Sequence, residues 1–213
     1  MLRIDIIGDI NCPWCALGLT SLNKAIEQIA DDIELDIHSQ PFELNAALPA
    51  EGVGLKQYLQ QQYGMSDAQF ESSHQMLAER GRALGFNFAK RERLWNTFNC
   101  HRLIFWAGEQ YGQGQQLALL RELTQAYQGE ALDISQPEVL LNAVQKAGLD
   151  SERAAQILAS DEYSVEVRKA QKQWRDAGVS SVPTVVINGR HALSGAQPTE
   201  TYVAALRDLA SQQ

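Results

Sequence analysis

The sequence predicts an α/β fold in which a β-α-β unit and a β-β-α unit are separated by a large all-helical insertion. Three observations support this. The chain opens with an alternating, isoleucine-rich run that leads into a helical pattern. From about Leu55 to Ala177, amphipathic segments follow one another without a convincing strand, and after Gly178 a β-branched run returns. We therefore expect a discontinuous α/β domain at residues 1–45 and 178–213, with an inserted helical domain at 46–177.

The first unit of this α/β domain is predicted from the opening of the chain, up to Pro41. Leu2 to Ile7 alternates and is rich in isoleucine, which is typical of a strand, and Gly8 to Pro13 interrupts it. From Pro13 on, apolar residues recur at helical spacing. Ile33 to His38 alternates again, and Pro41 ends this second strand. The opening is therefore predicted to be β-α-β.

The middle block is predicted to be helical because its apolar residues recur at helical spacing and several segments start or stop at capping residues. Ser66 or Asp67 and Ser135 stand before helix starts, and glycines follow helix ends. The predicted segments are Leu55–Gly64, Asp67–Leu84, Leu94–Tyr111, Gln115–Tyr127, Pro137–Ala147, Ser151–Ala159 and Tyr163–Ala177.

The C-terminal part is predicted to be β-β-α. VPTVVING is a β-branched run that ends in an Asn-Gly turn, and RHALSG is a short partner strand, so the two predict a β-hairpin. Gln197 to Leu209 has helical spacing, with Pro198 near its start. Val182-Pro183 opens the first strand of the hairpin, where proline is tolerated at an edge or a chain reversal, and a cis peptide is one way to achieve this.

Composition limits the partners. Acidic residues outnumber basic ones by 26 to 18 in the 213 residues, which gives a formal net charge of −8 and makes nucleic acid a poor partner. Asp5 and Asp9 interrupt the first apolar stretch and no small-residue cleavage site follows, so we expect no secretory signal. No run of about eighteen apolar residues would cross a membrane. The expected location is the cytoplasm.

Cys12 and Cys15, in INCPWCALG, stand where the first helix is predicted to begin. A helix start offers unpaired N–H groups and the positive end of the macrodipole, which favour a thiolate. We therefore expect Cys12 to be a nucleophile with a lowered pKa and Cys15, one turn deeper, to be the resolving thiol. Pro13 suits the first helical position, and Trp14 offers a surface for a thiol substrate. Asp9 is a candidate to accept or relay the proton of Cys15, or to act as an N-cap or loop residue.

Two other interpretations of the cysteine pair were weighed. A tetrahedral zinc site needs two further ligands, and the other Cys and His residues show no second paired spacing, so we predict no metal site. These residues are Cys100, His38, His74, His101 and His191. A structurally inert pair is the second alternative. The strand-then-helix context favours redox use.

Four stretches of the sequence carry a family resemblance: DINCPWCALG, NTFNCHRLIFWA, GVSSVPTVVINGRHALSGAQP and AYQGEALDISQPEVLLNAVQKAGLD. They resemble the DsbA superfamily of thioredoxin-fold proteins with a helical insertion, and within it the FrnE-like branch, over essentially the whole chain. The resemblance implies a thioredoxin fold and a thiol–disulfide oxidoreductase. It also implies that Cys12 is the nucleophile, that Cys15 is the resolving cysteine, and that Val182-Pro183 is a cis-proline loop facing the substrate.

The same superfamily contains glutathione-dependent relatives, the 2-hydroxychromene-2-carboxylate isomerases and kappa-class glutathione transferases. These typically carry Ser at the position of Cys12, so the presence of both cysteines argues against their chemistry. Small thiols remain candidate substrates. Secreted DsbA proteins have a signal peptide and a Pro-His pair where this chain has Pro13-Trp14, which argues against a strongly oxidising role.

Five further residues are weaker candidates. Cys100 lies in an apolar helical segment and is expected to be a buried small hydrophobe, with a third redox thiol as the alternative. Asn96, His101 and Arg102 share that segment and are candidates to line a cleft between the helical block and the α/β domain. Gln197, in SGAQP, is a further candidate for this cleft.

Three functions were considered. The leading hypothesis is a cytoplasmic thiol–disulfide oxidoreductase that acts on protein or small-molecule thiols and disulfides. The second is a glutathione-dependent isomerase or transferase whose substrate pocket the helical insertion walls off. The third is a non-catalytic, chaperone-like peptide-binding module. We expect no cofactor beyond the redox-active Cys12–Cys15 disulfide, with glutathione a candidate co-substrate and a homodimer a candidate assembly. The direction of electron flow and the substrate stay open.

Overall fold

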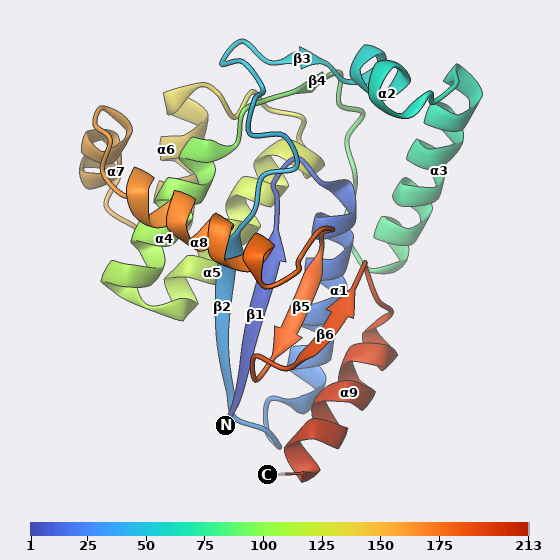
Figure 1. Cartoon of the computed structure of the whole chain (residues 1–213), viewed down its shortest axis with the longest axis vertical. Coiled ribbons are helices and arrows are strands. Elements are labelled where there is room, and N and C mark those ends of the chain that lie inside the picture. The colour runs from blue at the N-terminus through green and yellow to red at the C-terminus, as the bar shows by residue number, and fades with distance from the viewer. Residues whose placement is uncertain (213) are drawn as a thin grey trace.

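A central sheet organises the molecule in the computed structural model, which describes residues 1–212 (Figure 1). The strands are β1 Leu2–Gly8, β2 Leu35–Pro41, β5 Thr184–Ile187 and β6 His191–Ser194. They lie in the order β2-β1-β5-β6, with β2 parallel to β1 and the other neighbours antiparallel. Both predicted units are present, so the α/β class with a helical insertion is confirmed.

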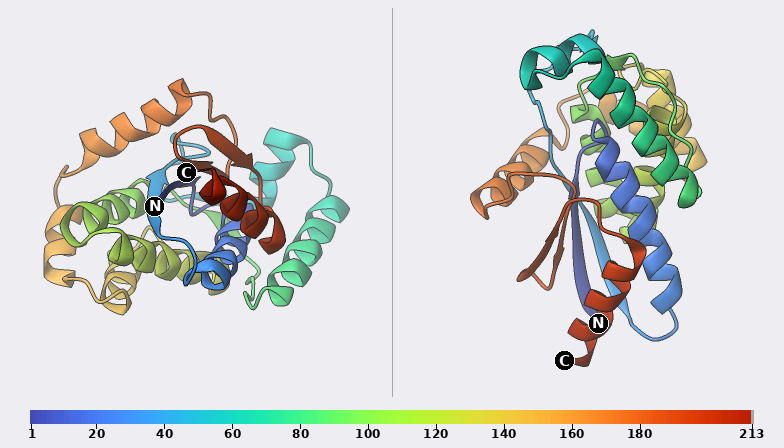
Figure 2. Two further views of the ribbon diagram at one scale, coloured as in Figure 1. Left: turned by 90° about the horizontal axis from the view of Figure 1, so that it is seen from below. Right: turned by 90° about the vertical axis from the view of Figure 1, so that its right-hand side faces the viewer.

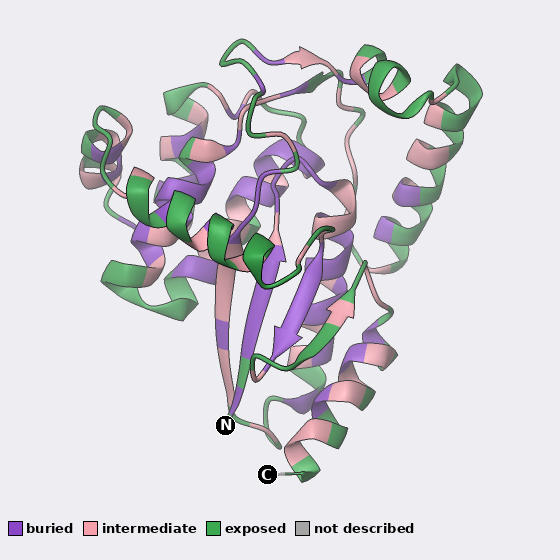
Figure 3. Ribbon diagram, viewed as in Figure 1, coloured by how far each residue is buried: buried purple, intermediate pink, exposed green. Residues whose placement is uncertain are grey.

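Helices lie on both faces of this sheet (Figure 2). They are α1 Pro13–Ile29 and α9 Thr199–Ser211 on one face and α8 Ser164–Asp176 on the other. The alternation of β1 explains this arrangement, because successive side chains of a strand point to opposite faces. Leu2, Ile4 and Ile6 pack with α1 and α9, whereas Ile7 packs on the side of Trp174 in α8. The strand β6 is an exposed edge, while β5 is buried along its length (Figure 3).

The insertion between the two units contains most of the helices. Its elements are β3 Val53–Gly54, α2 Leu55–Tyr63, α3 Asp67–Ala83, β4 Arg93–Leu94, α4 Phe98–Tyr111, α5 Gln113–Thr124, the π-helix η1 Gln125–Gly129, α6 Pro137–Lys146 and α7 Ser151–Leu158. Within residues 1–212, none of the helices has the length and apolar character needed to cross a bilayer.

The helices α4 to α7, residues 98–158, pack around one shared core and are called the bundle below. Trp106, Leu119 and Val144 are completely buried at its centre. Ile10, from the loop after β1, belongs to the same core, and Leu117 of α5 packs with the sheet. The bundle therefore supports the α/β core directly, and the division of the chain into two domains stays a prediction.

Residues 53–94 form a second part of the insertion, called the arm below. The arm consists of α2, α3 and the short β3–β4 ribbon, and α2 and α3 stand on the opposite side of the molecule from the bundle (Figure 1). Its core is small, with Leu48, Leu55 and Leu94 as the buried residues of one cluster. The arm therefore encloses less apolar packing than the bundle does.

The structure corrects one predicted helix. The segment Leu94–Tyr111 was expected to be helical throughout, but Leu94 belongs to β4 and α4 begins only at Phe98. Asn96 prevents an earlier start, since its Oδ1 accepts the N–H of Phe98 and its Nδ2 donates to the carbonyl of Leu48 at 3.0 Å. A two-residue strand is too short to show an alternating pattern, so no local signal predicts it.

A second correction concerns the end of the segment Gln115–Tyr127. The α-helix α5 ends at Thr124, and a π-helix continues to Gly129. Such wider turns are rare and insert an extra residue into the helix, which redirects the side chains that follow. Here Gln128 becomes completely buried.

Candidate active site

Cys12 stands at the N-terminal end of α1, where the chain turns from β1 into the helix. It is the N-cap residue, and Pro13 follows in the first turn. Its carbonyl accepts the N–H groups of Cys15 and Ala16 at 3.1 and 3.3 Å. The first N–H groups of a helix lack carbonyl partners within it, so the positive end of the helix lies at Cys12. Only 5% of Cys12 is exposed.

Cys15 lies one turn further along α1, and both thiols are free. Gly8, at the end of β1, makes room for it, because a Cβ at Gly8 would lie 3.3 Å from the Cys15 Sγ. Residue Cys15 is half-buried, and its thiol lies between the strand and the helix.

The two thiols have opposite pKa shifts. A hydrogen bond from the Cys15 thiol lowers the pKa of Cys12, and the backbone N–H groups of Cys15 and Trp14 lower it further, against the effect of burial. Burial raises the pKa of Cys15 well above that of an ordinary cysteine, and its contact with Cys12 adds to this. The negative charge of Asp9 raises the pKa of both thiols.

The loop before β5 faces the cysteine pair. The Val182–Pro183 peptide bond is cis, and the Cys12 thiol donates to the Val182 carbonyl with an Sγ–O distance of 3.7 Å. Gly18 allows this loop to approach α1 closely, because a Cβ there would lie 3.1 Å from Cγ of Pro183. The structure thus brings together the two segments that the sequence singled out, which lie about 170 residues apart.

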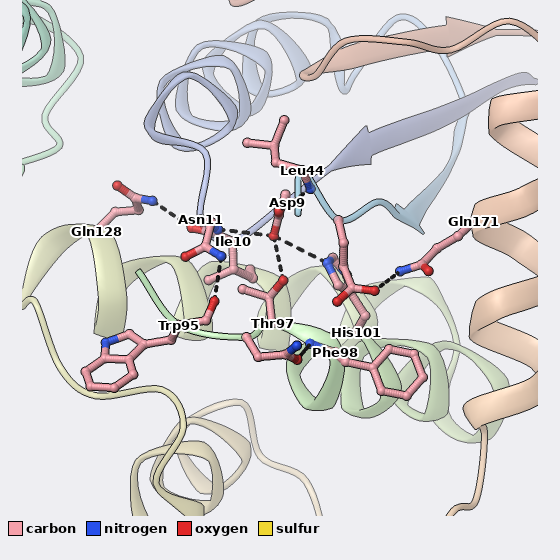
Figure 4. Close-up of polar contacts among 12 residues, drawn as sticks. Asp9, Ile10, Asn11, Leu44, Trp95, Thr97, Phe98, His101, Gln128 and Gln171 are labelled. Atoms are coloured by element: carbon pink, nitrogen blue, oxygen red, sulfur yellow. Dashed lines mark hydrogen bonds and ion pairs between the residues drawn. The ribbon is translucent and has the colours of Figure 1, made fainter. Parts of the chain in front are cut away.

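Asp9 is the centre of a buried polar network behind Cys12 (Figure 4). This carboxylate is 2% exposed. It accepts the N–H of Asn11 at 3.2 Å, the N–H of Leu44 at 2.7 Å and the hydroxyl of Thr97 at 2.8 Å. His101 Nε2 lies 3.6 Å from the same carboxylate. Asp9 therefore ties the cysteine loop to the loop after β2 and to the start of α4, and it is not the N-cap of α1.

Two residues that the sequence did not single out hold the cysteine loop, Gln128 from the bundle and Arg91 from the end of the arm. Gln128, placed by the π-helix, donates to the Ile10 carbonyl at 2.6 Å. Arg91 donates to the Asn11 carbonyl at 3.3 Å and stacks over the ring of Tyr127 at 5.0 Å. These contacts join residues about 80 to 120 positions apart, which local sequence patterns do not encode.

A further missed residue, Glu43, anchors the loop that follows β2. The residue is 2% exposed, and its carboxylate accepts from Gln171 Nε2 at 3.0 Å and forms an ion pair with Arg168, both in α8. Arg175 of the same helix donates to the Glu43 carbonyl at 3.1 Å. The helix α8 therefore fixes the position of Leu44, whose N–H binds Asp9.

A cavity of about 350 Å³ opens beside Cys12, between the start of α1, Val182, residues 44–48 and the arm. Pro13 and Trp14 form part of its wall. Arg80 of α3 lies over the Trp14 ring at 5.5 Å, so the arm also contacts the cysteine motif from outside. Most of the lining from the arm is apolar or aromatic, including Leu55, Tyr58, Leu59, Phe70, Leu77 and Leu94.

The predicted cleft residues Asn96, Arg102 and Gln197 do not line this cavity in the described part of the chain. Asn96 shapes the start of α4, as described above. Arg102 donates to carbonyls of residues 157, 160 and 162 at the C-terminal end of α7, where a cation is favourable. Gln197 donates to the Ser194 carbonyl at 2.6 Å, before α9. These three side chains therefore make structural contacts. Asn96 also lines a separate cavity beside residues 133–136, and a role for the three in substrate binding stays a prediction.

His101 and Cys100 lie deeper. His101 is 4% exposed and borders a void of about 30 Å³ that Cys15 and Asp9 also line. Cys100 is completely buried in the bundle core, and burial raises its pKa strongly. Among residues 1–212, no group of three or more His, Cys, Asp or Glu side chains is arranged to hold a metal ion.

A Cys-X-X-Cys pair at the N-terminus of the first helix, beside a proline loop before an antiparallel strand, defines a thioredoxin-fold protein with a dithiol site. The chain belongs to the family of DsbA-like thioredoxin domains, whose family model matches residues 3–207. The family resemblance seen in the sequence is thereby confirmed. No curated protein matches the sequence.

Solved structures give the same fold. A protein from Streptomyces coelicolor described as "probable DsbA oxidoreductase SCO1869" is 28% identical, with a TM-score of 0.92 over 100% of this chain and 92% of that one. A 2-hydroxychromene-2-carboxylate isomerase is 18% identical, with a TM-score of 0.74 over 99% and 97%. DsbM from Pseudomonas aeruginosa, a cytosolic disulfide reductase solved with GSH, is 16% identical, with a TM-score of 0.69 over 98% and 99%. The last two likenesses concern the fold alone.

Proposed function

We propose that this protein is a thiol–disulfide oxidoreductase in which Cys12 is the nucleophile and Cys15 the resolving cysteine. The observation that carries the proposal is the pair of free thiols at the N-terminus of α1, with the Cys12 sulfur 3.7 Å from the Val182 carbonyl of the cis-proline loop. The lowered pKa of Cys12 and the raised pKa of Cys15 agree with it. The thiolate is the reactive form of cysteine, so the thiol that ionises more readily attacks first.

In the reductive direction, the Cys12 thiolate attacks one sulfur of a substrate disulfide. The substrate S–S bond breaks, one half leaves as a thiolate, and a mixed disulfide joins Cys12 to the other half. Cys15 then loses its proton and attacks the Cys12 sulfur. This step releases the second half as a thiolate and leaves a Cys12–Cys15 disulfide. The substrate gains two electrons and the protein loses two, and the reverse sequence oxidises a dithiol.

Three contacts support this assignment. The hydrogen bond from Cys15 stabilises the Cys12 thiolate until exchange begins. The carbonyl of Val182 lies beside the Cys12 sulfur, so the cis-proline loop is placed to contact the substrate half of a mixed disulfide. Asp9 shares a small void with Cys15, and we propose this void as the route by which the Cys15 proton leaves.

The FrnE-like branch and a cytoplasmic location belong to the same proposal. The first rests on the quoted sequence stretches. The second is supported by the relative DsbM, which is named a cytosolic disulfide reductase. That relative was solved with GSH, so glutathione is the first co-substrate to test. A homodimer stays a prediction.

Reduction of insulin disulfides by dithiothreitol tests the proposal. Cys12→Ser is expected to lower the catalysed rate about a thousandfold, because removal of a nucleophile abolishes the covalent route. Cys15→Ala is expected to accumulate a mixed disulfide on Cys12, visible by intact mass. Cys100→Ala is the matched control, since it removes a thiol that lies outside the site. Full activity in Cys12→Ser would overturn the proposal.

A further inference from the structure

The cavity beside Cys12 is a built site rather than a gap between helices. Its volume of about 350 Å³ lies within the range of small-molecule pockets. Cys12 itself is part of the wall, and only 5% of this residue is exposed. A partner that reacts with Cys12 therefore approaches a sulfur that faces this enclosed space.

The lining favours an apolar ligand body. The lining includes Tyr58, Leu59 and Tyr63 of α2, and Phe70 and Leu77 of α3. Aromatic and aliphatic walls gain free energy when they exclude water around an apolar ligand, at about 25 cal/mol per Å² buried. A polar ligand would bury little apolar surface and would not gain this free energy.

The charge of the lining is opposite to that of the molecule. The chain has a formal net charge of −8, yet the cavity lining in the described residues contains Lys90, Arg91 and His74 and no Asp or Glu. Lys90 already pairs with Glu71 at 3.2 Å. Arg91 forms no ion pair with a carboxylate of residues 1–212 and contacts the Asn11 carbonyl instead. An anionic group on a ligand would therefore complement the site.

Asn11 is a buried polar residue of the cavity wall. It is 5% exposed, and its Oδ1 is shielded from solvent and has no hydrogen-bond partner among the described residues. The Nδ2 of Asn11 is already used, as it donates to the Trp95 carbonyl at 2.6 Å. A ligand donor would reach the Oδ1 only after the side chain turned, so the apolar and cationic lining alone indicates the substrate class.

We propose that this cavity is the substrate site for a small disulfide with an aromatic or branched aliphatic body and an anionic group. The inference rests on the proposed function and deepens it by naming the substrate class. Cys12 attacks the substrate sulfur nearest the α1 N-terminus, the substrate S–S bond breaks, and one thiolate leaves while the other half stays bound as a mixed disulfide. Cys15 then displaces it, and two thiols leave per Cys12–Cys15 disulfide formed.

Three symmetric disulfides test this substrate class with the reduced protein: bis(carboxyphenyl) disulfide, which is anionic and aromatic, dipyridyl disulfide, which is aromatic and uncharged, and bis(hydroxyethyl) disulfide, which is small and polar. Each rate is divided by the rate of the same disulfide with free glutathione, which removes differences in intrinsic reactivity. We expect the normalised rate of the carboxyphenyl compound to exceed that of the hydroxyethyl compound about tenfold or more. Equal normalised rates would overturn the inference.

Matched variants test whether the preference for the carboxyphenyl compound arises in the cavity. Ser73→Phe fills the cavity from α3, and Ser72→Phe places the same side chain at an exposed position outside the lining. Ser73→Phe is expected to remove the preference for the carboxyphenyl compound, while Ser72→Phe keeps it. Arg91→Gln also removes a contact to the cysteine loop, so its effect is measured as the ratio of the carboxyphenyl rate to the dipyridyl rate, which is expected to fall about fivefold. Lys172→Gln on α8 is the charge control. An unchanged preference in Ser73→Phe would overturn the inference.

A binding measurement on the unaltered protein covers the case in which Ser73→Phe does not fold. Bis(carboxyphenyl) sulfide has the shape and charge of the probe but no S–S bond, so it occupies the site without reacting. It is expected to slow alkylation of Cys12 by iodoacetamide in a saturable way, and absence of protection would contradict the proposed site. If Cys12 exchanges with all three disulfides at equal normalised rates, only this inference fails. If it exchanges with none, the proposed function fails as well.

Discussion

The two parts of the helical insertion differ in how tightly they are packed. In the bundle, Trp106, Leu119 and Val144 are completely buried in one continuous core. In the arm, the buried residues Leu55 and Leu94 belong to a small cluster, and the space beside them is a cavity that reaches Cys12. The two parts of the insertion therefore have different roles. The bundle holds the cysteine loop through Gln128, and the arm lines the cavity beside Cys12.

The largest expected effect comes from making the same substitution in both regions. Leu119→Ala in the bundle should lower the free energy of unfolding by about 2–5 kcal/mol, because it leaves a void in a close-packed core. Leu59→Ala in the arm should cost less than about 1 kcal/mol, because this side chain is only partly buried and already borders empty space. Urea unfolding of both variants measures the difference. The comparison fails if the two losses of stability are equal.

Arg102, in the bundle, is expected to affect stability but not disulfide exchange. Arg102→Leu leaves carbonyls at the end of α7 without their donor and should cost about 1–3 kcal/mol in urea unfolding. The rate of disulfide exchange in the folded variant should stay within about twofold of the parent, because the side chain is remote from the cavity. Arg102→Lys, which keeps the charge, is the matched control. A fall in exchange rate without a loss of stability would instead place Arg102 in the site.

The next largest expected effect is on the pH dependence of Cys12 alkylation, and it comes from the hydrogen bond between the two thiols. Alkylation of Cys12 by iodoacetamide should rise with pH as the thiolate forms, with its midpoint below that of an ordinary cysteine. Cys15→Ala removes the main cause of the lowered pKa, so the midpoint should move to higher pH. Cys15→Ser keeps a hydroxyl donor and should move it less. A midpoint that falls in Cys15→Ala would show that the hydrogen bond is not the cause.

Substitution of Asp9 is expected to give the smallest change in the pH midpoint of Cys12 alkylation. The charge of Asp9 raises the pKa of Cys12 and is one of the smaller causes, so Asp9→Asn should move the Cys12 alkylation midpoint to lower pH, by less than Cys15→Ala moves it to higher pH. The same change replaces the acceptor of the Leu44 N–H and should cost about 1–2 kcal/mol of stability. Thr97→Val removes a hydrogen bond to Asp9 and keeps the charge. It should therefore destabilise the protein without lowering the midpoint.

The parts of the fold that the sequence predicted are those with a strong local signal. Ile4 and Ile6 alternate with the other residues of β1, and Pro13 marks the start of α1. The Asn188-Gly189 turn has positive φ at both residues, as the hairpin signal requires. The same locality explains the placement of the cysteine pair at a helix start.

Local sequence patterns do not predict contacts between residues that lie far apart in the chain. Gln128 reaches Ile10 only because a π-helix follows α5, and Glu43 is explained by partners in α8. The polar residues Asn96 and Arg102 lay close to functional motifs in sequence, yet each is used by nearby backbone groups. A polar residue on a predicted helix therefore says little about a site until its partners are known.

The most direct test of the proposed exchange chemistry is the reduction potential of the Cys12–Cys15 pair. The protein is equilibrated in glutathione buffers of graded ratio, thiols are trapped by alkylation, and peptides are identified by mass spectrometry. We predict one two-electron transition in which Cys12 and Cys15 oxidise together while Cys100 stays reduced. If no Cys12–Cys15 disulfide forms at any ratio, the pair does not act as a dithiol, and the proposed exchange mechanism is contradicted.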